Sequence, residues 1–205
     1  RGWRVARRPP PAGTAPPGTV PTPADWWHPA SAFVQALQAA GHTLASPDDP
    51  FSWTQDLDGL VGDDREWQEA GKSLRWYLQS YPVDAIIAHS HGGNVVALAL
   101  AGGAMVDILI TVATPVRPEL ADAYAQTHLR VGRWTHLRSD GADSWQRWGS
   151  RTWRDWLRPW RWGAFERDMA AADCNVFVPG VSHAGLLEPG LWTDRGWWGW
   201  LGERP

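Results

Sequence analysis

The sequence predicts an α/β fold in which a mostly parallel central sheet carries helices on both faces. Short apolar, β-branched runs alternate along the chain with segments whose apolar residues recur at helical spacing. One of the runs, Asp107–Ala113, is apolar on both faces. That pattern is typical of a strand inside a parallel sheet that is covered by helices on each side.

The first expected element is a helix over Ala30–Ala40. Pro29 stands in its first turn and Gly41 ends it, and its apolar side chains recur at helical spacing. A second helix is expected from Asp63 or from Asp64 to Ser80, because apolar residues again fall along one side.

The remaining elements alternate between strand and helix up to residue 138, and a last strand follows. They are expected at Val83–Ala88 (strand), Gly92–Ala101 (helix), Asp107–Ala113 (strand), Glu119–Leu129 (helix), Arg133–Arg138 (strand) and Asn175–Val178 (strand). This order is the signature of a layered α/β protein.

Length and composition limit the organisation and the partners of the chain. Its 205 residues suit one domain. Residues 1–24 are rich in proline and lack a periodic pattern, so we expect an irregular segment there and a single domain over residues 25–205. The net charge of −3 provides no general attraction for nucleic acid. The lone cysteine, Cys174, excludes an internal disulfide and a cysteine-based zinc site.

Targeting signals are not evident in this sequence. Residues 1–23 contain no apolar core of the kind a secretory signal needs. The longest apolar stretch, Val95–Ala113, is interrupted by Gly102, Gly103 and Asp107, whereas a membrane span needs about 20 uninterrupted apolar residues. We therefore expect a soluble, cytoplasmic protein.

A serine stands in a tight turn between an expected strand and an expected helix, in the run Ala88-His89-Ser90-His91-Gly92. A sharp strand-to-helix turn strains its central residue and needs small neighbours two positions away on each side, and Ala88 and Gly92 meet that need. Such a turn raises the hydroxyl above the sheet edge, and the following helix directs free N–H groups to the same place. Ser90 is therefore the candidate nucleophile.

A serine hydroxyl needs a base that takes its proton. His183 follows the expected strand Asn175–Val178, in a loop at a carboxyl end of the sheet, where α/β proteins gather their sites. Asp140 and Asp143 follow the preceding strand, and one of them would orient the imidazole. We prefer Asp143, which opens an acid-x-x-Gln pattern, and Asp140 is the alternative.

These three segments resemble the α/β-hydrolase superfamily, in particular its lipase-like and esterase-like members. The resemblance covers about residues 17–195 and includes Ala113-Thr114-Pro115 and Ser182–Leu187. It implies a serine hydrolase that cleaves a small-molecule carboxylic ester without a cofactor. Ser90 attacks the carbonyl, His183 shuttles the proton and Asp143 orients the imidazole. An acyltransferase or a thioesterase of the same superfamily is the alternative.

The resemblance also implies an oxyanion hole with two backbone donors. One is the N–H of His91, and the candidate for the other is Thr19, in the early loop Pro17–Val20. Proline stands where this family has histidine, and the prolines of residues 7–13 rule out a central strand before the loop. Loss of one donor lowers the rate by about 10²–10³. A non-catalytic, hydrolase-like binding protein is therefore a second alternative.

The segment Ser144–Gly163, between the candidate acid and the candidate base, is rich in tryptophan and arginine. Its tryptophans fall on one side of an amphipathic helix and its arginines on the other. One interpretation is a lid, with Trp153 and Trp156 at the substrate entrance and a weak contact with a lipid interface. The other is a cap helix whose tryptophans pack on the domain. Trp26 and Trp27 have the same two interpretations, pocket lining or packing.

His89 and His91 flank Ser90, and a His-x-His pair is a familiar metal-binding pattern. Side chains two residues apart in a sharp turn diverge, however, and no third ligand is evident. We therefore expect no metal site. The sequence leaves open the acyl group, the alcohol and the oligomeric state.

Overall fold

The computed structural model describes residues 26–45, 51, 64–139 and 168–202. Within this part of the chain four strands form one sheet, and every neighbouring pair is parallel. In sheet order, which is also chain order, they are β1 (Ala85–His89), β2 (Val106–Val112), β3 (Val131–Ser139) and β4 (Cys174–Val178). The prediction of an α/β fold around a parallel sheet is confirmed, with each predicted strand present.

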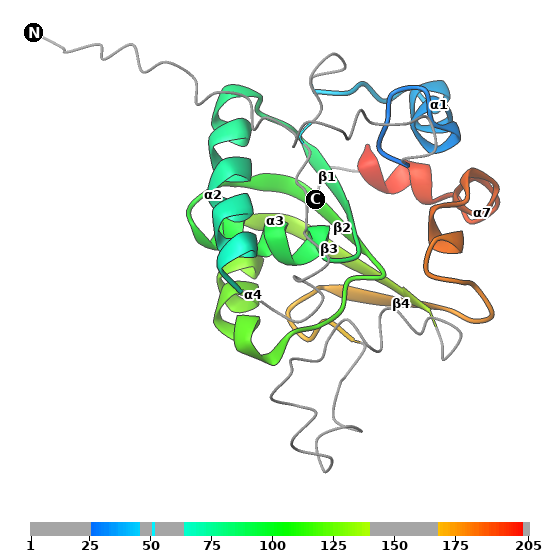
Figure 1. Ribbon diagram of the computed structural model, residues 1–205. Coiled ribbons are helices and arrows are strands. Elements are labelled where there is room, and N and C mark those ends of the chain that lie inside the picture. The colour runs from blue at the N-terminus through cyan, green and yellow to red at the C-terminus, as the bar shows by residue number, and fades with distance from the viewer. Residues whose placement is uncertain (1–25, 46–50, 52–63, 140–167, 203–205) are drawn as a thin grey trace, which may run out of the picture.

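Helices cover both faces of the sheet (Figure 1). One face carries α2 (Asp64–Ser80), α3 (Gly92–Ala101) and α4 (Ala121–His128). The other face carries α1 (Ala32–Ala39) and α7 (Pro189–Asp194). Single 3₁₀ turns lie at Pro118–Leu120, Gly185–Leu187 and Trp197–Leu201. The connections from β1 to β2 and from β2 to β3 contain α3 and α4, respectively, and a helix is the usual connection between parallel strands.

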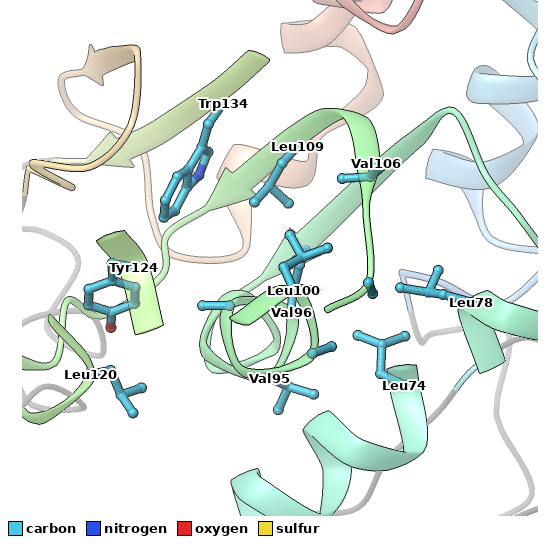
Figure 2. Packing of buried hydrophobic residues seen from close by; sticks show 14 of the residues in the cluster. Leu74, Leu78, Val95, Val96, Leu100, Val106, Leu109, Leu120, Tyr124 and Trp134 are labelled. Atoms are coloured by element: carbon cyan, nitrogen blue, oxygen red, sulfur yellow. The ribbon is translucent and has the colours of Figure 1, made fainter. Parts of the chain in front are cut away.

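The larger core lies between the sheet and the helices α2, α3 and α4. Its buried members include Leu74, Leu78, Val95, Val96, Leu100, Leu109 and Trp134 (Figure 2). The helix α3 is buried along most of its length and packs against both α2 and α4. Because α3 begins two residues after Ser90, this core fixes the backbone that follows the candidate nucleophile.

The second core lies on the α1 and α7 face and includes a cluster of aromatic side chains, here called the aromatic core. Phe33 of α1 makes edge-to-face contacts with Trp26 and Trp192, at ring-centroid distances of 5.5 and 5.1 Å. Trp192 in turn meets Trp197 at 5.7 Å, and both indoles are almost fully buried. Such pairs add to the stabilisation from buried area. Part of the high tryptophan content of this chain therefore serves packing.

The first helix starts later than Pro29 suggests. Ser31 is its N-cap, and the Ser31 hydroxyl accepts a hydrogen bond from the N–H of Val34 at 3.1 Å. A serine side chain satisfies one of the free N–H groups of a helix start, and proline has no group that does so. The helix α7 is not predicted from the sequence, and it has only six residues.

Several predicted features lie outside the described residues. They are the irregular segment 1–24 and the tryptophan- and arginine-rich segment 144–163. Among the residues that the structure describes, no helix has both the length and the apolar character needed to cross a membrane.

Candidate functional site

Ser90 occupies the turn between β1 and α3 with a left-handed backbone, at φ 54°. This region is uncommon for a residue with a side chain and marks a strained position. Two backbone hydrogen bonds stabilise the turn. The N–H of Ser90 donates to the carbonyl of Val112 in β2 at 2.8 Å, and the Ser90 carbonyl accepts from the N–H of Gly93 at 3.1 Å. The structure thus has the sharp strand-to-helix turn that the sequence predicts.

Gly93 is the residue after Ser90 at which a side chain would clash with its surroundings. A Cβ built on Gly93 would lie 2.1 Å from Oγ1 of Thr114, in the segment that follows β2. A Cβ on Gly92 would meet nothing within 4 Å. The sequence pattern predicts the demand for a small residue at Gly92, and that prediction is wrong. What requires glycine is the close approach of the first turn of α3 to Thr114.

The side chain of His91 is enclosed on the α2 side of the turn. Its ring stacks on Trp67 with centroids 4.8 Å apart, and its Nδ1 lies 3.4 Å from the amide nitrogen of Asn94. The guanidinium of Arg117 lies 4.5 Å from the centroid of the same indole. Burial, together with the charge of Arg117 and the nearby His183, lowers the pKa of His91 from 6.5 to about 4. The imidazole is therefore neutral at pH 7.

The backbone N–H of His91 is one of the donors that the sequence assigns to an oxyanion hole. A helix start leaves its first N–H groups without partners inside the helix. No acceptor for the His91 N–H is present among residues 26–45, 51, 64–139 and 168–202. Within the described part of the chain, this donor therefore has no partner.

A buried chain of hydrogen bonds stands behind His91. The Asn94 amide donates to the carbonyl of Pro115 at 3.3 Å, and its oxygen accepts from the hydroxyl of Tyr124 at 2.9 Å. The same hydroxyl accepts from the N–H of Arg117 at 2.9 Å, and the Arg117 guanidinium pairs with Glu119. Burial raises the pKa of the Tyr124 phenol above its ordinary value, so it stays protonated and able to donate. We call this set, with Trp67 and His91, the α3 polar network.

The loop that carries His183 is tied to the sheet at two points. The hydroxyl of Ser139, the last residue of β3, donates to the carbonyl of Val181. Nε2 of His89 lies 3.2 Å from the carbonyl of His183, and the two imidazole centroids are 4.5 Å apart. The predicted base therefore packs against the residue that directly precedes Ser90.

A cavity of about 450 Å³ opens beside the turn. Ser90 lines it together with His89 and His91, and so do Trp26 and Trp27. Trp26 meets the His89 ring edge-on, with centroids 6.0 Å apart. Both tryptophans that the sequence offers as pocket lining thus lie at this cavity, and Trp26 also packs on the aromatic core described above.

The other predicted site residues fall outside the described part of the chain. They are the two candidate acids Asp143 and Asp140, the second oxyanion candidate Thr19, and the lid candidates Trp153 and Trp156. Asp140 directly follows Ser139, the residue that ties the His183 loop to β3.

Metal ligands do not cluster in the described residues, where no group of three or more His, Cys, Asp or Glu side chains is placed to hold an ion. The two histidines of the His-x-His pair diverge as expected. His89 faces His183, and His91 faces Trp67.

The residues that support the turn are not predicted from the sequence. Trp67 shows only as one apolar residue of a helical pattern, and Asn94, Arg117 and Tyr124 carry no motif. Their polar atoms meet only once three helices are placed on the sheet. His89 can be seen next to Ser90 in the sequence, but there it suggests only a metal ligand and not a contact with the His183 loop.

Comparison with known proteins leaves the site to be interpreted from its own chemistry. The described fold defines a parallel α/β protein with a strained serine at the carboxyl end of a strand. No protein-family model, no curated protein and no solved structure matches the chain.

Proposed function

We propose that the protein is a serine hydrolase of the α/β-hydrolase kind that cleaves a carboxylic ester through an acyl-enzyme. The observation that carries the proposal is the left-handed backbone of Ser90 at the β1–α3 turn. Strain of this kind persists where the surrounding structure imposes it, and it concentrates at functional sites. The loop of His183 beside His89 supports the same conclusion, and so does the N–H of His91, which has no acceptor among the described residues.

In the proposed reaction the Ser90 hydroxyl attacks the ester carbonyl while His183 takes its proton. The negative charge that develops on the carbonyl oxygen is stabilised by the N–H of His91 and, in the full site, by Thr19. The alcohol leaves with the proton from His183, and the acyl group stays on Ser90. Water, deprotonated by His183, then releases the acid.

The acid that orients His183 is Asp143 in this proposal, with Asp140 as the alternative. Both residues follow the end of β3 in sequence. A carboxylate that accepts from the imidazole fixes its tautomer and stabilises the cation that forms after proton transfer. Replacing each aspartate by asparagine separates the two, because only the true partner should lower the rate by a large factor.

The test of the proposal is labelling by a fluorophosphonate, which reacts with an activated serine. We expect the intact chain to be labelled, Ser90→Ala to abolish labelling, and His183→Ala to slow it strongly. Ser73→Ala is the matched control, since Ser73 is an exposed serine on α2. A folded chain that refuses the probe would overturn the hydrolase proposal and favour a non-catalytic binding protein.

A further inference from the structure

The strand β1 has one edge that no other described strand covers, because in the sheet it pairs only with β2. The carbonyl of Asp84 and the N–H of Ser90 both bond to β2. In a parallel pair, residues that bond to the neighbouring strand alternate with residues that face away from it. Every second residue from Asp84 to Ser90 therefore faces β2. Ala85 and Ile87 lie between them and present their N–H and C=O groups to the open edge.

Cavities border this open edge on both faces of the sheet. One, of about 450 Å³, is lined by Leu74 of α2 and Val95 of α3. The other, of about 500 Å³, is lined by Leu37 of α1. The helices α2 and α1 cover opposite faces of the sheet, and both cavities have Ala85 and Ile87 in their lining (Figure 1). The two cavities therefore meet at the edge of β1, and we call them together the β1 groove.

The open edge is polar, although most side chains around it are apolar. A backbone N–H or C=O that loses water without gaining a hydrogen bond is destabilising. A second extended backbone supplies both donors and acceptors at the spacing of a strand, and its side chains alternate between the two faces. The edge and its two cavities thus match one kind of ligand, a β-strand.

Charge in the β1 groove narrows the choice of strand. Among the described residues that line the two cavities, the only aspartate, glutamate, lysine or arginine is Asp84. Its side chain is exposed just before β1 begins. A strand with apolar side chains and a basic residue at the Asp84 end complements this lining. The β1 segment of a second copy does not, because residues 82–90 contain no lysine or arginine.

We propose that the β1 groove binds an extended peptide segment of another protein by strand addition. The peptide backbone pairs with Ala85 and Ile87, and its apolar side chains alternate between the two cavities. A lysine or arginine of the peptide lies beside Asp84. Binding needs no chemistry at Ser90, so this interaction surface goes beyond the proposed function.

The probes are two capped, fluorescently labelled hexapeptides of alternating valine and leucine, one with lysine at the first position and one with lysine at the last. The two orders place the lysine beside Asp84 in a parallel and in an antiparallel pairing. Fluorescence anisotropy with the full chain should show saturable binding of at least one probe. A single N-methyl group should weaken binding about tenfold at every second peptide position, where an N–H faces β1, and have little effect between them. No saturable binding, or an effect without this alternation, would overturn the proposal.

Amide hydrogen exchange locates the pairing on the protein. In the free chain, Ala85 and Ile87 should exchange faster than Ile86 and Ala88, whose N–H groups face β2. At saturating peptide the difference between the two pairs should largely disappear, because all four N–H groups are then bonded. A difference that persists in the complex would place the peptide elsewhere and overturn the proposal.

A proline variant tests the same edge. Ala85→Pro removes one outward N–H and retains the bonds to β2, and proline is tolerated at such positions of an edge strand. It should weaken peptide binding about tenfold with a near-normal melting temperature. Should this variant not fold, the N-methyl series and the charge variants described next decide the question without it.

The charge variant is Asp84→Asn, which should weaken binding of the lysine peptide by up to about fivefold. A peptide with norleucine in place of lysine should bind both proteins equally. Asp107→Asn is the matched control, since Asp107 is exposed on β2, and it should leave both affinities unchanged. Equal effects of the two variants would overturn the role of Asp84.

Two further outcomes separate this site from the other proposal and from self-association. Ser90→Ala should bind the peptide with unchanged Kd, so a chain that binds peptide but refuses the fluorophosphonate keeps the groove and loses the hydrolase. Sedimentation velocity measures the oligomeric state. A dimer that Ala85→Pro converts to a monomer, in a chain that binds neither peptide, would assign the edge to a second copy and overturn the proposal.

Discussion

The two histidines that flank Ser90 stand in different surroundings. His91 faces α2, where its ring stacks on Trp67 and contacts Asn94 within the α3 polar network. His89 faces the other side of the turn, where it meets Trp26 and holds the carbonyl of His183. One side is a buried set of side chains around the helix start. The other is a partly exposed aromatic contact with a loop.

The difference suggests a division of roles around the nucleophile. The His91 side fixes the backbone of the turn, because buried polar groups that bond to one another restrict the arrangement of their neighbours. The His89 side holds the loop that carries the proposed base. We therefore expect changes on the His91 side to act mainly on the stability of the fold, and changes on the His89 side to act mainly on the rate of the reaction.

The largest expected effect is that of Trp67→Ala. Trp67 is 1% exposed, and truncation of a buried tryptophan lowers the free energy of unfolding by about 3–5 kcal/mol. Trp76→Ala, at a 40% exposed tryptophan of the same helix, should stay within about 1 kcal/mol. Urea unfolding of both variants measures the difference. Equal losses in the free energy of unfolding would show that Trp67 stabilises the fold no more than the exposed Trp76 does.

The next effect concerns pH and the buried imidazole. His91 binds a proton near pH 6.5 when unfolded and only near pH 4 when folded. Between these pH values the unfolded chain holds more protons, so the free energy of unfolding falls as the pH drops. The difference in pKa corresponds to about 3 kcal/mol lost by pH 4.

The measurement for this pH effect is urea unfolding from pH 7 to pH 4 in the wild-type chain and in His91→Phe. Phenylalanine keeps a ring against Trp67 but carries no titrating group. The variant should therefore show a shallower fall than the wild type. Parallel curves for the two proteins would contradict the buried, neutral His91.

A smaller effect is expected from the first turn of α3. Gly93→Ala forces a Cβ against Thr114, and overpacking of this kind costs about 1–3 kcal/mol. Gly92→Ala, one residue earlier, meets open space and should change the free energy of unfolding by less than about 1 kcal/mol. Thermal or urea unfolding of the two variants measures the difference. Similar losses in the free energy of unfolding would contradict the close approach of Gly93 to Thr114.

The fold and the turn were predictable because their signals are local. The apolar run over residues 107–113 and the helical spacing of residues 64–80 depend on neighbours in the sequence, and so does the small-x-Ser-x-Gly pattern around Ser90. The position of Gly93 was not predictable in this way. Its constraint comes from Thr114, which follows another strand and approaches only after β1 and β2 pair.

The supporting residues of the site show the same limit more clearly. Nothing in the sequence around Trp67 or Tyr124 distinguishes them from ordinary core residues. Their roles depend on how α2 and α4 pack against α3, and that packing sets which buried polar atoms meet. A buried polar atom must find a partner, but the sequence alone does not tell which one.

The smallest expected change in stability, and the sharpest test of the comparison, is at His89. His89→Leu removes the contact with the carbonyl of His183, and a net hydrogen bond of about 0.5–1.5 kcal/mol corresponds to at most about a tenfold loss in kcat. His89→Gln retains a side-chain N–H and should recover part of the rate. KM should change little in either variant, because the loop positions the base and does not bind the acyl chain.

His42→Leu is the control for His89, since His42 makes an equivalent contact, 3.1 Å from the carbonyl of Trp198, away from Ser90. It should leave kcat unchanged, as measured with p-nitrophenyl acetate. One outcome would contradict the difference in role between the two sides of Ser90. In that outcome His89→Leu lowers the free energy of unfolding as much as Trp67→Ala does, and kcat of the folded fraction stays at the wild-type value. A fall in kcat with near-normal stability would instead establish His89 as a positioning residue for His183.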